Sequence, residues 1–116
     1  MIKIEEKGNN IYMVASGKLN DEDYDKMLPL LRQKINAYEK INWYFQMKDF
    51  EGWTPHAFWR DLKFDLQNKG HLEKVAIVGE KKWQELMTAT MNLFTNVKIW
   101  YFDEEDALIA KEWVES

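Results

Sequence analysis

The sequence predicts one α/β domain over residues 1–116, with an N-terminal hairpin, a mixed sheet of four to five strands and about four helices. A length of 116 residues is usual for one domain, and no linker or repeat divides the chain. Strand and helix patterns follow one another in the order β-β-α-β-α-β-α-β-α, which favours a sheet whose later strands are parallel. A continuous apolar run at residues 75–78 is typical of a central strand buried on both faces.

The first two strands form the predicted hairpin. Ile2 and Ile4 alternate with charged residues, which is the pattern of an edge or half-exposed strand. Residues 8–10, Gly-Asn-Asn, are a turn signal, and the mostly apolar residues 11–16 follow as the second strand. We expect this second strand to end at Gly17.

The first helix is predicted by its start and by its apolar spacing. Asn20 is a suitable N-cap, and the acidic residues 21–23 complement the exposed N–H groups of a first helical turn. Pro29 lies inside the helix, so we expect a kink or a break near Leu28. The apolar residues at helical spacing are Tyr24, Met27, Leu28, Leu31, Ile35 and Tyr38.

The middle of the chain predicts a strand, a loop and a helix. Residues 41–47 contain three consecutive aromatic residues and are typical of a strand, and residues 49–53 are expected to form a loop. Thr54 and Pro55 then open a second helix, which ends at Gly70.

The last third of the chain repeats the alternation. Residues 74–79 predict a strand, residues 83–94 a third helix and residues 97–102 the last strand. Asp103 is the expected cap of a final helix. Its predicted buried face consists of Ala107, Ala110, Trp113 and Val114.

Charge and composition exclude several functions. The net charge is −4 and the longest basic run is Lys81-Lys82, so we expect no nucleic acid among the partners. The absence of cysteine excludes a disulfide scaffold, a thiolate zinc site and a thiol nucleophile. No signal peptide or membrane span is visible in the sequence. We therefore expect a cytoplasmic protein, with peripheral membrane association as the alternative, and no metal site.

A set of short motifs is spread, in order, over nearly the whole chain. These are Ser16-Gly17-Lys18-Leu19, Asp23-Tyr24, Leu28-Pro29, Gly52-Trp53, Trp59-Arg60-Asp61, residues 74–79 with Trp83, and Tyr101-Phe102-Asp103 with Ala107 and Trp113. The set resembles the SpoIIAA-like branch of the STAS family, also described as STAS/SEC14-type. The resemblance implies a SpoIIAA-like (STAS) fold, with no enzymatic activity and no cofactor. It also associates the chain with apolar ligands or membrane surfaces.

The sequence departs from the family pattern at one functional position. In anti-sigma antagonists of the STAS family, a phosphorylatable serine stands at the start of the helix after the third strand. The matching residues 48–55 contain no serine, and Thr54 is their one hydroxyl group. Thr54 is therefore the remaining candidate for phosphorylation, although it also has a structural role as the predicted cap of the second helix.

Aromatic and Met residues gather around one predicted loop and the third helix. In open α/β sheets, ligands bind beyond the carboxyl ends of the parallel strands, and the loop at residues 49–53 is expected there. Met side chains adapt to varied apolar partners. The candidate residues for binding an apolar small molecule or a membrane surface are Phe50, Trp53, Phe58, Trp59, Phe64, Trp83, Met87, Met91 and Phe94.

Other interpretations of the same residues remain open. A core role is favoured for those on the inner helix stripes, which are Trp59, Trp83, Met87 and Phe94. Trp53, in a loop, and Phe64, on the charged side of a helix, are the best candidates for an exposed apolar patch. Such a patch could instead serve a protein partner, so the alternative function is a protein-interaction or regulatory module, which could be a homodimer. The acidic net charge argues against anionic membranes.

A catalytic function has the weakest support. His56 and His71 have no serine or carboxylate partner at motif spacing. Asp49, Glu51 and Asp61 could gather at the carboxyl edge of the sheet, where paired carboxylates can act as acid and base. Charged loops are usually just solvated, so we expect no catalytic residue.

Overall fold

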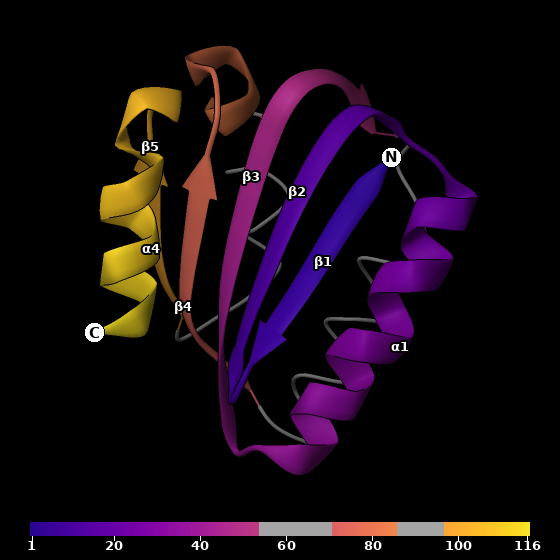
Figure 1. Ribbon diagram of the computed structural model, residues 1–116, viewed down its shortest axis with the longest axis vertical. Helices are drawn as coiled ribbons and strands as arrows, with labels where there is room; N and C mark the ends of the chain where they lie inside the picture. The colour runs from indigo at the N-terminus through magenta and orange to yellow at the C-terminus, as the bar shows by residue number, and fades with distance from the viewer. Residues whose placement is uncertain (54–70, 86–96) are drawn as a thin grey trace.

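The computed structural model describes residues 1–53, 71–85 and 97–116 (Figure 1). Its sheet has five strands in the spatial order of the sequence. β1 and β2 form the predicted antiparallel hairpin, and β2 to β5 are parallel. The predicted fold class, a mixed α/β sheet of four to five strands, is therefore confirmed. The strands are β1 (Ile2–Lys7), β2 (Asn10–Leu19), β3 (Lys40–Trp53), β4 (His71–Val78) and β5 (Lys98–Phe102).

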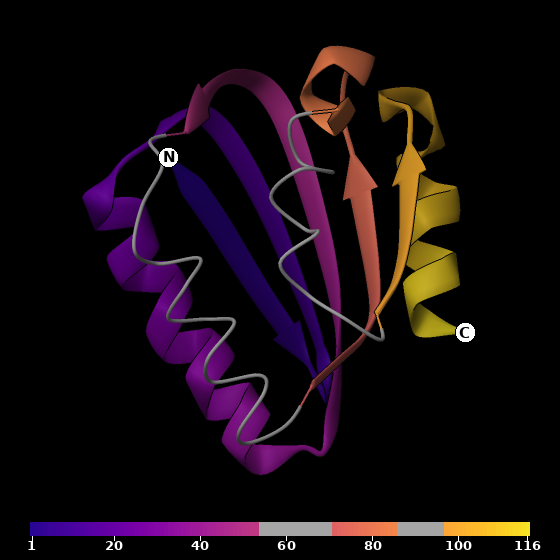
Figure 2. The ribbon, with the colours of Figure 1, turned by 180° about the vertical axis from the view of Figure 1, so that it is seen from behind.

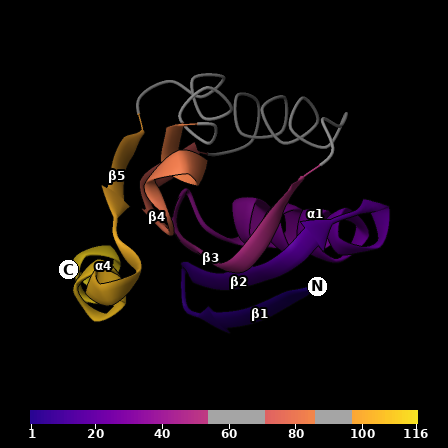
Figure 3. The ribbon, with the colours of Figure 1, turned by 90° about the horizontal axis from the view of Figure 1, so that it is seen from above.

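The helices cover the two faces of the sheet (Figures 2 and 3). α1 (Asp21–Ala37) packs on one face, and α4 (Ala107–Glu115) packs on the other, after the short helix η1 (Glu104–Asp106). Residues 81–85 form the helical start of the predicted third helix, beyond the end of β4. The predicted second helix lies outside the described residues.

The start of α1 is fixed by the predicted cap. The Asn20 side chain accepts a hydrogen bond from the backbone N–H of Asp23 at 3.1 Å, and Asp23 accepts one from the backbone N–H of Asn20 at 3.0 Å. This reciprocal pair satisfies two N–H groups. The helix continues through Pro29, so of the two expected outcomes, a kink or a break, the break is wrong. Met27 and Leu31, both fully buried, hold the turns on each side of the proline against the sheet, which compensates for the one lost hydrogen bond.

The core has two parts, because strand side chains alternate between faces. The face under α1, called here the α1 face, is lined by Ile11, Met13, Ala15, Trp43, Phe45, Met47, Val75 and Ile77. The opposite α4 face is lined by Tyr44, Ala76 and Val78, which pack against Ala110 and Val114 of α4. α4 lies over β3 and β4. The rest of the α4 face therefore carries side chains on both sides of this helix.

β2 and β3 both run further than the sequence pattern indicates. β2 continues through Gly17 to Leu19, and β3 continues through residues 49–53, so the predicted strand end and the predicted loop are both wrong. Ala15 pairs with Met47 and Leu19 pairs with Trp53, which gives β3 two more residues than β2 in this segment. These extra residues are accommodated as β-bulges, and Asp49 adopts a positive φ of 50° in the first. The bulges interrupt the alternating pattern, which is why it resembles a loop.

The ends of α4 differ from the prediction at one side. Asp103 precedes η1 rather than α4, and its side chain makes no capping hydrogen bond. At the other end, the Lys74 ammonium group lies 2.6 Å from the carbonyl oxygen of Ser116 and 3.4 Å from that of Trp113. A cation at this position complements the carbonyl groups of the last helical turn. Lys74 thus attaches the C-terminal end of α4 to β4.

Candidate functional site

The carboxyl ends of β3, β4 and β5 meet at one edge of the sheet, called here the C-terminal edge. Phe50 lies there in the bulged end of β3, with 8% of its surface exposed. Its ring meets the ring of Trp83 edge to face, with 5.2 Å between centroids and 81° between planes. This is a favourable aromatic geometry. Because Trp83 is only partly buried, the pair extends the core to the surface at this edge.

The backbone at Gly52 and the side chain of Gln84 position this aromatic pair. Gly52 has a φ of 128°, which other residues rarely adopt, and a Cβ added there would lie 3.6 Å from the indole of Trp83. The Gln84 side-chain amide donates to the carbonyl oxygens of Gly79 at 2.9 Å and Phe102 at 3.1 Å. One side chain therefore joins the ends of β4 and β5 to the helical residues 81–85. The C-terminal edge is held by specific contacts on three strands.

Of the predicted binding residues, the structure brings Phe50 and Trp83 together. The backbone of Trp53 ends β3 rather than lying in a loop. The core role favoured for Trp83 agrees with its packing against buried residues of the α1 face, while the ammonium group of Lys82 lies 5.3 Å from its ring. The other predicted positions lie outside the described residues, and these are Thr54, Phe58, Trp59, Phe64, Met87, Met91 and Phe94.

The residues considered for catalysis gain no support. Asp49 is exposed at the bulge of β3, and it lines a shallow polar hollow of about 320 Å³ with Lys3 and Lys48. His56 and Asp61 lie outside the described residues. Within the described parts of the chain, no three His, Asp or Glu side chains gather as metal ligands would. Asp49 is thus placed beside lysines on the open part of the α4 face.

One side of α4 is bordered by polar contacts, and we call Tyr12, Tyr44, Lys111 and Glu115 the polar flank. The Tyr12 hydroxyl donates to Glu115 at 2.7 Å, and the ammonium group of Lys111 lies 5.5 Å from the ring of Tyr44. The two tyrosine rings are 6.0 Å apart. A hollow of about 310 Å³ on this side is lined by Glu5, Glu6, Lys7, Tyr12, Lys111 and Glu115.

Both tyrosines of the polar flank stay protonated far above neutral pH. Burial raises the pKa of Tyr44 to about 12, and its hydroxyl donates to the Gln46 side chain at 2.8 Å. Burial also raises the pKa of Tyr12 to about 12, with further contributions from the hydrogen bond to Glu115 and from the charge of that carboxylate. Neutral tyrosines at this position act as hydrogen-bond donors rather than as bases.

The other side of α4 is bordered by apolar contacts, and we call Trp100, Phe102, Ile109 and Trp113 the apolar flank. The ring of Trp113 lies 6.2 Å from that of Trp100 and 6.1 Å from that of Phe102. Ile109 is one helical turn before Trp113 and shares its side of the helix. Trp100 is 60% exposed and Ile109 is 56% exposed.

The sequence interpretation missed the apolar flank, although its signal was present. β5 has the sequence KIWYF, in which every residue after the first is apolar or aromatic. Ile109 is apolar but falls outside the predicted buried face of the final helix. A strand and a helix that both carry surplus apolar residues near the chain end predict an apolar surface where they meet.

Comparisons with known proteins agree with this architecture. No helix in the described residues is long and apolar enough to span a membrane. A search of curated proteins found no significant match. A crystal structure of an uncharacterized protein of the DUF3478 family from Shewanella loihica PV-4, described as having a SpoIIAA-like fold, is similar to this chain. The TM-score is 0.66 and the sequence identity 33%, over 98% of this chain and 92% of that one.

The family comparison covers nearly the whole domain. The family model described as SpoIIAA-like matches residues 10–115, which include every strand and helix after β1. The match confirms the resemblance inferred from the motifs. This chain belongs to the SpoIIAA-like family.

Proposed function

We propose that this protein is a non-catalytic binding module that holds an apolar small molecule at the C-terminal edge, against Phe50 and Trp83. Family membership favours a binding or regulatory module of this kind rather than an enzyme. The observation that carries the proposal is the Phe50–Trp83 pair, a partly exposed indole backed by a buried ring at the carboxyl ends of parallel strands. An apolar group placed on that indole would extend an existing core.

Charge at the same edge favours a small ligand over a membrane. Lys81 and Lys82 are exposed beside Trp83, but Glu80 and Glu85 flank them. Peripheral binding to anionic lipid usually requires an excess of basic residues, and the whole chain has a net charge of −4. Peripheral membrane association is therefore the less favoured form of this proposal, and it would depend on aromatic side chains.

Native mass spectrometry of the freshly purified protein, together with titration of the fluorescent fatty acid cis-parinaric acid, tests the proposal. We expect a retained apolar molecule or saturable binding, which Trp83→Ala weakens about tenfold or more, equivalent to about 1.4 kcal/mol. Trp100→Ala is the matched control, because Trp100 is an exposed indole away from this edge. A ligand-free protein without saturable binding, or equal losses in both variants, would contradict the proposal. Flotation with neutral and anionic vesicles separates the membrane form from the small-ligand form.

A second candidate function is protein interaction or regulation, without the phosphorylation switch. The apolar flank, with its exposed Trp100 and Ile109, favours it. The described residues do not test the switch, because Thr54 lies outside them. Phosphorylated Thr54 would be detected by mass spectrometry of protein purified from its native cells.

A further inference from the structure

The two outer strands of the sheet, β1 and β5, differ in their content of charged residues. β1, with the sequence IKIEEK, has four charged residues in six, whereas β5, with the sequence KIWYF, has one in five. Charged residues on an edge strand discourage pairing with another chain. β5 carries no such protection beyond Lys98, and within the described residues its one strand neighbour is β4. Among the described residues, β5 therefore presents an unprotected pairing edge.

The side chains of β5 make this edge a docking surface rather than a bare backbone. Trp100 is level with Ala76 on the α4 face, and α4 lies over β3 and β4 rather than over β5. Trp100 consequently fills the space beside α4, against Trp113 and near Ile109. The exposed part of the apolar flank and the free edge of β5 are thus parts of the same surface.

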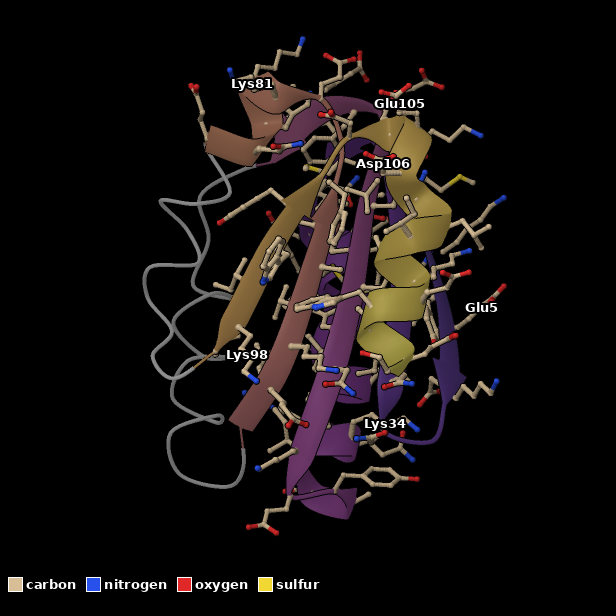
Figure 4. The ribbon with its side chains drawn as sticks, turned by 90° about the vertical axis from the view of Figure 1, so that its left-hand side faces the viewer. Glu5, Lys34, Lys81, Lys98, Glu105 and Asp106 are labelled. Atoms are coloured by element: carbon tan, nitrogen blue, oxygen red, sulfur yellow. The ribbon has the colours of Figure 1, made fainter. Side chains whose placement is uncertain are left out.

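The charges along this surface favour a second copy of this chain, in antiparallel orientation, as the binding partner. Figure 4 shows Lys98 at one end of β5 and Glu105 and Asp106 at the other end, beside the start of α4. Residues 103–106 are all acidic, and Lys98 makes no ion pair within the described parts of the chain. A second copy in antiparallel orientation brings Lys98 of each chain beside the acidic end of the other. A parallel copy would bring like charges together.

We propose that β5 pairs antiparallel with β5 of a second copy, centred on Trp100, and that the two sheets become continuous in a two-fold dimer. In this arrangement Trp100 and Ile109 of both copies fill the space between the two α4 helices, which lie on the same face. The pairing is self-complementary, as a two-fold interface must be. The outer edges of the joined sheet are the charged β1 strands, so assembly stops at two copies. The proposal is independent of the ligand site at Phe50 and Trp83.

Sedimentation velocity over a concentration series tests the dimer. We expect a monomer–dimer equilibrium whose dissociation constant rises about tenfold or more in Trp100→Glu and in Lys98→Glu. Leu108→Glu is the matched control, because Leu108 is 70% exposed on α4 and lies on the side of the helix that carries Lys111 and Glu115, away from the apolar flank. Circular dichroism confirms that each variant is folded. A wild-type protein that stays monomeric, or a folded Trp100→Glu variant that dimerises normally, overturns the proposal.

A charge exchange tests the orientation. Two Lys98→Glu chains should repel each other, and so should two Asp103→Lys/Glu105→Lys chains, because each variant homodimer places like charges at both ends of the paired strands. A mixture of the two variants restores unlike charges at both ends, so we expect a mixed dimer with near wild-type affinity. Failure of the mixture to dimerise, when the wild-type protein does, excludes the antiparallel arrangement. Trp100-dependent flotation with vesicles in place of dimerisation would instead assign this surface to a membrane and overturn the proposal.

Discussion

The two flanks of α4 are held to the same sheet by opposite means. The polar flank uses a hydrogen bond from Tyr12 to Glu115 and the stacking of Lys111 on Tyr44. The apolar flank uses aromatic packing and leaves Trp100 and other apolar surface in water. Directional polar contacts satisfy their own groups, whereas exposed apolar surface is still available for further burial. The proposed dimer uses this difference, because its interface buries the apolar flank and leaves the polar flank in solvent.

The largest expected effect comes from disrupting the buried contact between α4 and the sheet, which lies between the two flanks. Ala110, in the middle of α4, is fully buried against the sheet, so Ala110→Asp places an unpaired charge between helix and sheet. We expect the free energy of unfolding to fall by more than about 3 kcal/mol. Urea denaturation measures it, with the exposed Leu108→Asp on the same helix as control. A loss below about 1 kcal/mol would mean that α4 is not needed for the stability of either flank.

The next largest effect is the loss of stability at alkaline pH, which should arise from Tyr44 in the polar flank. Tyr44 is neutral in the folded state up to a pKa of about 12, against an ordinary value of 10.0. Since the folded state holds this proton more tightly, its contribution to stability is complete below about pH 10 and is lost as pH rises towards 12. The loss can reach about 2 to 3 kcal/mol for this fully buried side chain. Denaturation at several alkaline pH values should show a steeper decline for wild type than for Tyr44→Phe, and equal slopes would contradict the assignment.

The apolar flank is tested by truncating its central ring. Trp113→Ala removes the packing against Trp100 and Phe102 and the cation–π contact with Lys74, and it should cost about 2 kcal/mol of stability because Trp113 is only partly buried. It should also weaken the dimer, since Trp100 loses its support. Thermal denaturation and sedimentation measure the two effects. Retained dimerisation at lowered stability would separate the packing role of Trp113 from the proposed interface.

The smallest effect is expected at the rim of the polar flank. Glu115→Gln keeps an acceptor for the Tyr12 hydroxyl but removes the charge, so the stability change should be below about 1 kcal/mol. The pKa of Tyr12 should fall while staying above its ordinary value, because burial is the largest cause of its shift. Absorbance titration of tyrosinate, with Tyr12→Phe as reference, measures it. An unchanged titration would show that Glu115 does not act on Tyr12 in solution.

The sequence predicts the fold well because periodicity and capping are local. Alternation at Ile2 and Ile4 indicates an edge strand, the run at residues 75–78 indicates a buried one, and Asn20 is the cap that it is expected to be. The prediction fails where a local rule is overridden by packing. Pro29 stays helical because its neighbours are buried, and residues 49–53 stay in β3 because bulges absorb the break in alternation.

The candidate site is less accessible from sequence, since it depends on which surplus apolar residues meet in space. Phe50 and Trp83 could be assigned to the same edge from the rule for parallel strands, and the structure places their rings in contact. The apolar flank combines Trp100 of β5 with Ile109 of α4, and the periodicity within either element alone does not reveal that they lie on one surface. A useful rule is to count apolar residues that a predicted buried face leaves over.

The bulges of β3 hold spare chain length, which makes this segment the natural place for the domain to gain or lose residues. Deleting Asp49 or Glu51 alone would remove one of the two bulges, and deleting both would return β3 to the spacing of β2, while Phe50 stays on the α1 face. Deleting Gln46, in the regular part of the ladder, would instead turn every earlier or later side chain to the wrong face. The fold can therefore tolerate a change of length at the point where β3 approaches Trp83, and the direction in which that edge opens can vary between relatives or be altered by design without rebuilding the sheet.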